Sequence, residues 1–149
     1  MNCGRDFEAI LGDATVAGPA SEEEVLHAER QLSLRFPDSY RQFLKEYGAA
    51  LGDGFEISGL FTGDGTGPPL WRDIVVECKR FRNAVQGTLP DSYLPISDDG
   101  CGVTYYIDAA MSEDSTSPVI AYGPGVDGTV VADSFEEFVV RLAHDQLVI

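Results

Sequence analysis

The segment RFPDSYRQFLKEYGA, from Arg35 to Ala49, constrains the fold more than any other part of the chain. Pro37 suits the first turn of a helix, where a missing backbone N–H costs nothing, and the acid after it complements the positive end of the helix dipole. Large apolar residues then recur at helical spacing, at Tyr40, Phe43, Leu44 and Tyr47. Gly48 is the expected left-handed terminator. The segment therefore predicts a helix with one aromatic face and no arrangement of catalytic groups.

A second helix is predicted just before this one. The sequence SEEE, starting at Ser21, is a capping box in which the Ser21 hydroxyl and the Glu24 carboxylate each accept a hydrogen bond from the other residue's backbone. Val25, Ala28 and Leu32 follow on one face. Glu29 lies at the edge of this apolar stripe, and two interpretations are open: a general acid with a raised pKa, or an ion-paired helix position.

The rest of the chain alternates between strand and helix signals. FEISGLF (55–61) predicts a strand, and TGDGTGPPL (62–70) predicts a loop that lacks the lysine of a phosphate-binding loop. WRDIVVECKRFRNAV (71–85) predicts a helix with the basic cluster Arg72, Lys79, Arg80 and Arg82, which either neutralises acids within the fold or contacts a partner. Trp71 is either an interface anchor or a packing residue.

Short strands are then predicted within 94–133, and Ser134 opens a last helix with a second capping box, SFEE. Helices first, a meander of strands and a closing helix predict an α+β fold. We expect a single domain, with N-terminal helices packed on a mainly antiparallel β-sheet that is covered mainly on one side.

The formal net charge of −15 is distributed unevenly. From Asn83 to Ile149 there are eleven acids and a single base, Arg141. Such a surface repels a phosphate backbone, so we expect no direct binding of nucleic acid. It attracts a basic partner, such as a protein that itself binds nucleic acid, or it serves only solubility.

The sequence predicts a cytoplasmic protein. No apolar run approaches the roughly 20 residues that cross a bilayer, so we expect no membrane partner. The N-terminus lacks the layout of a signal or transit peptide. The cysteines, Cys3, Cys78 and Cys101, are odd in number and share no CxxC spacing, which is typical of reduced thiols.

No pattern in the sequence indicates a reaction. His27 and His144 fit no zinc-binding spacing, and there is no GxSxG nucleophile motif. Asp98 and Asp99 are adjacent in a DDG turn, where side chains usually diverge and stay solvated. We therefore expect no catalytic residue, no metal, no cofactor and no enzyme activity.

The predicted elements resemble the SUKH superfamily, which includes yeast cell-wall regulators and many bacterial immunity proteins. The resemblance runs from about Ala20 to Leu142 and implies a single SUKH-like domain over 1–149, with a core at about 20–147. It rests on three groups of residues: Glu29, Leu32, Phe36, Pro37, Tyr40, Phe43, Leu44 and Gly48; then Asp99, Gly100, Gly102, Tyr105 and Asp108; then Ser134, Phe135, Phe138 and Leu142. The loops YGAALGDG and GDGTGPPLW depart from the family pattern.

The resemblance implies a non-enzymatic protein that binds and neutralises a cognate bacterial toxin, often one that acts on nucleic acids. The acidic surface fits a basic toxin, and we expect a monomer or weak dimer. The alternatives are a regulatory scaffold for an endogenous protein, or an enzyme or ligand-binding protein with a deep pocket at Tyr105, Trp71 or Glu29. From loop placement and charge, the predicted partner-binding residues are Asp53, Asp64, Trp71, Asp98, Asp99, Glu113 and Asp114.

Overall fold

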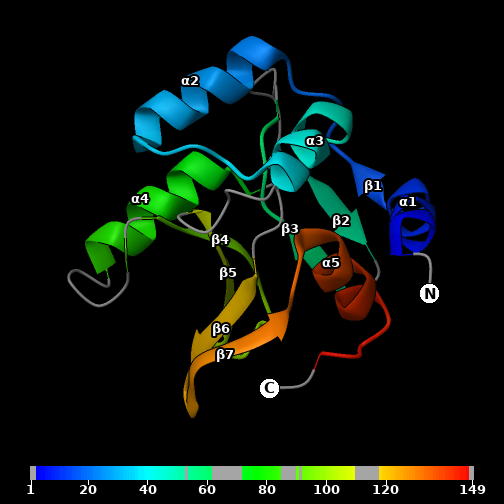
Figure 1. Ribbon diagram of the computed structural model, residues 1–149, viewed down its shortest axis with the longest axis vertical. Helices are drawn as coiled ribbons and strands as arrows, with labels where there is room; N and C mark the ends of the chain where they lie inside the picture. The colour runs from blue at the N-terminus through cyan, green and yellow to red at the C-terminus, as the bar shows by residue number, and fades with distance from the viewer. Residues whose placement is uncertain are drawn as a thin grey trace.

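The computed structural model describes residues 3–52, 54–61, 72–84, 90, 92–109 and 118–147 (Figure 1). The helices in this part are α1 (Cys3–Asp13), α2 (Glu22–Leu32), α3 (Asp38–Glu46), α4 (Ile74–Ala84) and α5 (Phe135–Ala143). The strands are β1 (Thr15–Val16), β2 (Ala50–Gly52), β3 (Phe55–Ile57), β4 (Tyr93–Asp98), β5 (Thr104–Asp108), β6 (Val119–Gly123) and β7 (Val126–Ala132). The predicted α+β fold is confirmed.

The strands form two antiparallel sheets, with the orders β1-β2-β3 and β4-β5-β6-β7. Hydrogen bonds join the sheets where β3 approaches β4. The Ser58 N–H donates to the Ile96 carbonyl at 2.8 Å, and the Ser97 hydroxyl donates to the Glu56 carbonyl at 2.6 Å. These bonds fix β3, an edge strand of the first sheet, relative to β4, an edge strand of the second.

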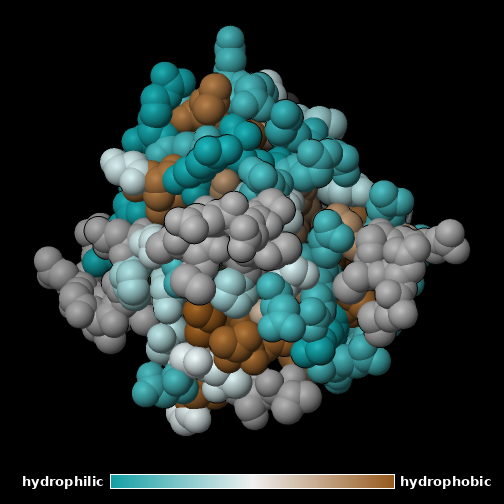
Figure 2. All heavy atoms as spheres, viewed as in Figure 1, coloured by the Kyte–Doolittle hydropathy of each residue, from teal (hydrophilic) through white to brown (hydrophobic). Residues whose placement is uncertain are grey.

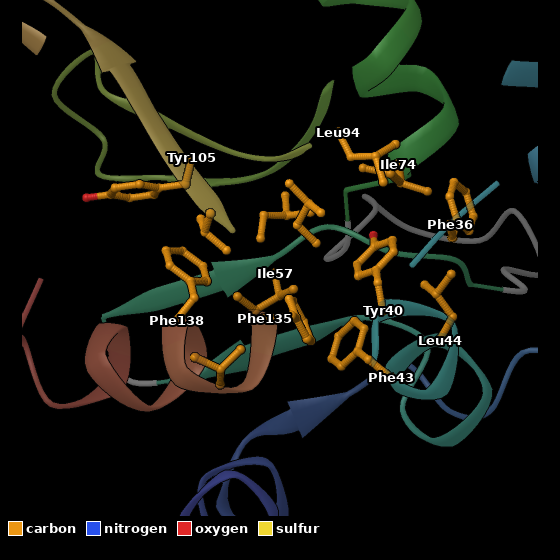
Figure 3. Close-up of a cluster of buried hydrophobic side chains, with 14 of the residues drawn as sticks. Phe36, Tyr40, Phe43, Leu44, Ile57, Ile74, Leu94, Tyr105, Phe135 and Phe138 are labelled. Carbon is orange, nitrogen blue, oxygen red and sulfur yellow. The ribbon is translucent and has the colours of Figure 1, made fainter. Parts of the chain in front are cut away.

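Helix α3 confirms the prediction made from the segment 35–49, and its aromatic face lies in the core (Figure 3). Tyr40, Phe43 and Leu44 are buried, and the Tyr40 hydroxyl donates to the Ser58 carbonyl at 2.6 Å. Gly48 has the expected left-handed backbone, with a φ of 80°. Helix α3 is therefore hydrogen-bonded to Ser58, the residue that also joins the two sheets.

Helix α5 packs its apolar side on the same core. Its Phe135 ring lies 5.4 Å from the Tyr40 ring and 5.2 Å from the Phe43 ring, measured between centroids. Phe7 of α1 lies 6.0 Å from Phe135. No helix was predicted before Ser21, so α1 is an addition to the predicted fold.

Helices lie against both faces of the second sheet, so the expectation of cover mainly on one side is wrong. Adjacent residues of a strand point to opposite faces. Tyr105 of β5 packs against Phe138 of α5, with ring centroids 5.1 Å apart. Its neighbour Tyr106 packs edge-to-face against Phe81 of α4 at 5.8 Å. Helices α4 and α5 therefore lie on opposite sides of β5.

Some predicted boundaries differ from the structure. The strand predicted over 55–61 ends at Ile57, and the predicted loop 62–70 lies outside the described residues. The capping box at Ser21 is complete, and Ser134 accepts a hydrogen bond from the Glu137 amide at 3.2 Å. Within the described part of the chain, no helix has the length and apolar character needed to cross a membrane.

Candidate partner-binding surface

The turn between β4 and β5 is shaped by its own carboxylates. One oxygen of Asp99, Oδ1, accepts from the Cys101 amide at 2.7 Å and from the Val103 amide at 3.0 Å. Asp98 Oδ1 accepts from the Gly100 amide at 3.0 Å. These are side-chain-to-backbone turns of the kind that Asp favours. The sequence DDGCG therefore encodes a defined turn, with Asp99 exposed at its tip.

Asp98 is neutralised within the fold. Its carboxylate pairs with the Arg72 guanidinium, which also lies 3.0 Å from Glu56 Oε1 through its Nε atom. The hydrogen bond to Asp98 raises the pKa of Arg72 above its usual value. Arg72 stays cationic, and two of the surrounding acids face a positive charge.

The basic cluster predicted on the third helix is therefore engaged largely within the protein. Besides Arg72, Arg80 lies 2.9 Å from Glu77, and Arg82 donates to the Leu32 carbonyl at 3.1 Å. Of the two interpretations made from the sequence, these contacts favour neutralisation and support of the fold.

A shallow hollow of about 310 Å³ lies beside the β4–β5 turn. The turn between β2 and β3 forms its other wall. Its lining consists of Leu51, Gly52, Gly54, Phe55, Glu56, Arg72, Asp98, Asp99 and Gly100. The structure thus brings two loops that are remote in sequence to one surface, which has an apolar side and an acidic side.

A further acid, from the C-terminal part of the chain, acts on the same tyrosine as Asp98 and Asp99. Burial raises the pKa of the Tyr105 hydroxyl, and the charges of Asp99, Asp98 and Asp145 raise it further. Asp145 follows α5, is exposed and has a left-handed backbone with a φ of 55°. The charges of these three carboxylates therefore all act on the Tyr105 hydroxyl. We call Glu56, Asp98, Asp99 and Asp145 the acidic cluster.

Two of the seven predicted partner-binding residues, Asp98 and Asp99, lie together in this cluster. The other five lie outside the described residues: Asp53, Asp64, Trp71, Glu113 and Asp114. The residues flanking Asp53, Gly52 and Gly54, line the hollow. Glu56 and Asp145 were not predicted from the sequence. Glu56 shares Arg72 with Asp98, and Asp145 acts on Tyr105, only in the folded chain.

Glu29 connects α2 to the start of α3. Its Oε2 atom accepts from the Phe36 amide at 2.7 Å and lies 3.4 Å from Arg41 Nε, while Arg41 also pairs with Glu22 at 3.0 Å. Only 11% of the Glu29 side chain is exposed. Of the two interpretations made from the sequence, this geometry supports the ion-paired structural position.

Three features of the described residues bear on the enzyme and ligand-binding alternatives. Among these residues, no group of three His, Cys, Asp or Glu side chains is placed to hold a metal ion. Burial raises the pKa of the Cys78 thiol to about 12, so it stays protonated at neutral pH and is a poor nucleophile. Tyr105, one of the expected pocket residues, is buried against Phe138. The features of this surface are its exposed carboxylates and the shallow hollow beside them.

Comparison with known proteins agrees with this fold. A model of the SMI1 / KNR4 family (SUKH-1) matches residues 19–141. This range covers α2, α3, α4, most of α5, and every strand of the two sheets except β1. No curated protein matches the sequence. The match spans most of the chain and includes all the residues on which the resemblance to SUKH proteins was based, except Leu142. The chain therefore belongs to the SMI1 / KNR4 family, SUKH-1.

Proposed function

We propose that this protein is a non-enzymatic immunity protein that binds and neutralises a cognate bacterial toxin through its acidic surface. The observation that carries the proposal is the acidic cluster beside the hollow, in a family member with a net charge of −15. Carboxylates on a rigid turn are suited to occlude a basic cleft. A toxin that acts on nucleic acids has such a cleft, because its substrate is a polyanion.

Asp99 and Asp145 are the charges of the cluster that we expect to act on a partner. Both residues are exposed, whereas Asp98 and Glu56 are paired with Arg72. Exposed charges at the rim of an interface mainly accelerate association, and salt screens them. We therefore expect the acidic cluster to set the association rate, and the walls of the hollow to provide apolar contacts.

The direct test measures binding of the purified protein to the C-terminal domain encoded by the adjacent gene, at low and high salt. We expect tight binding that weakens as salt rises, and survival of cells that produce both proteins. Absence of binding at both salt concentrations would contradict the immunity function. It would favour the alternative, a regulatory scaffold for an endogenous protein.

Asparagine substitutions separate charge from turn structure. Asp99→Asn keeps the oxygen that accepts from the Cys101 and Val103 amides, and Asp145→Asn suits a left-handed backbone. We expect the double variant to slow association by roughly tenfold at low salt, with little change at high salt. The matched control is the double variant Glu8→Gln/Glu23→Gln, at exposed positions on α1 and α2, which removes the same number of charges. An equal effect of both changes would show that only net charge matters.

A further inference from the structure

A second surface of this protein has the opposite character. A groove of about 780 Å³ runs along α2 and the link to α3, on the side away from the buried residues of α2. Leu26 and Leu34 contribute apolar lining, and among the described residues Leu26 is one of the few large apolar side chains that are exposed, at 41%. Apolar atoms lie among hydrophilic ones over α2 in Figure 2, at the top of the view.

The groove is basic within an acidic protein. Its charged residues are Arg30, Arg35 and Arg41, with a single acid, Glu29. That acid is occupied by Arg41 and by the Phe36 amide. Arg30 lies along α2 and donates to the Leu26 carbonyl at 3.3 Å, which places its guanidinium beside the exposed leucine.

Arg35 is the most available of these charges. Its side chain is 78% exposed, and its contact with Asp38, at 4.0 Å between exposed groups, is too weak to fix it. An apolar floor with guanidinium groups at its rim matches a segment that carries both carboxylates and a large apolar side chain.

From these features we infer that the groove is a docking site for an acidic segment of a protein partner, anchored by an apolar side chain. This inference goes beyond the proposed function, because the occupant has the opposite charge to the basic partner expected at the acidic cluster. The volume lies within the range of about 300–1,000 Å³ that is typical of ligand sites, and the open shape suits a peptide more than an enclosed small molecule. One small domain would then hold two partner segments of opposite charge.

The test uses the whole protein and synthetic peptides of about twelve residues that present an amphipathic face. One peptide combines Glu and Leu, a second replaces each Glu with Lys, and a third replaces each Leu with Ser. We expect only the first to bind, with NMR shifts confined to the backbone amides of α2 and residues 33–35. Failure of this peptide to bind, or shifts spread over the surface, would overturn the inference.

Two exposed positions keep the test independent of folding. Arg35→Glu and Leu26→Ser should each weaken binding of the Glu/Leu peptide by at least about fivefold. Lys79→Glu, an exposed position on α4, makes the same change in net charge and should leave affinity nearly unchanged. Equal weakening by Arg35→Glu and Lys79→Glu would overturn the groove as the site, since attraction would then be non-specific.

Sedimentation velocity of the protein alone distinguishes the other occupant, a second copy of this chain. We expect a monomer at low salt, because two copies with a charge of −15 repel each other. A salt-sensitive dimer that Arg35→Glu dissociates would overturn the inference of a separate partner.

Discussion

Replacement of Glu29 tests whether its role is structural. In the folded protein its carboxylate accepts from the amide of Phe36, a residue with no exposed surface, and pairs with Arg41, whose side chain is 19% exposed. Glu29→Ala leaves that amide without its acceptor and Arg41 with only Glu22. Loss of a hydrogen bond to a charged group costs about 1.5–3 kcal/mol, and removal of one partner of a fully buried ion pair costs about 3–5 kcal/mol. Because Arg41 keeps one acidic partner, we expect a loss of about 2–3 kcal/mol.

Thermal and urea denaturation measure this loss. For a domain of this size, about 2–3 kcal/mol corresponds to a fall in Tm of roughly 4–12 °C. Glu29→Gln keeps an oxygen for the Phe36 amide and loses only the charge, so we expect about half the effect. Glu23→Ala, at an exposed position of the same helix, should change stability by at most about 0.5 kcal/mol. If Glu29→Ala were as stable as the Glu23 variant, the structural interpretation would be refuted.

Three further predictions concern the core. Tyr40→Phe should lower the free energy of unfolding by about 1–3 kcal/mol in urea, because the buried Ser58 carbonyl loses its donor; an unchanged midpoint would contradict this. Gly48→Ala should largely prevent folding, since the added Cβ would lie 2.2 and 2.7 Å from two carbonyl oxygens. Gly54→Ala is the control, because Gly54 has a similar φ of 84° and its added Cβ would have no atom within 4 Å. Circular dichroism should show that this control variant remains folded. Burial raises the pKa of the Cys78 thiol to about 12 in the folded protein, from an ordinary value of 9.0. Above about pH 9 the thiol therefore loses its proton in the unfolded chain but keeps it in the folded protein. The free energy of unfolding should fall as pH rises from there. Cys78→Ala should reduce this alkaline loss, and an identical pH profile would refute the assignment.

The elements that the sequence predicted best are those determined by local signals. Helices α2 and α3 have caps and apolar residues at helical spacing within one segment, and the structure confirms both. Helix α1 has a similar signal at Phe7 and Leu11, both buried, although no helix was predicted there. Strands β1 and β2 have two and three residues and become strands only by pairing with each other and with β3, so no local pattern predicts them.

The candidate surface was predictable only in part, for the same reason. The turn at Asp98 and Asp99 follows from its DDG sequence, and the structure places both residues beside the hollow. The effect of the Asp145 charge on Tyr105, and the pairing of Asp98 with Arg72, depend on packing between segments that are distant in the chain. Loop composition identifies acids, but only the fold determines which of them are already neutralised.

Asp98 is paired with Arg72, whereas Asp99 and Asp145 are exposed, and this difference decides which substitutions best test the surface. Removal of the Asp98 charge leaves Arg72 facing only Glu56, so the hollow changes in both charge and side-chain order. Altered partner binding by an Asp98 variant would therefore not distinguish a direct contact from a shift of Arg72. Asp99 and Asp145 are exposed and their charges both act on Tyr105, so these charges can be removed while the pairing of Arg72 with Asp98 and Glu56 is kept. The double variant at these two positions is thus the most direct measure of the surface charge, and salt dependence shows whether that charge acts on association.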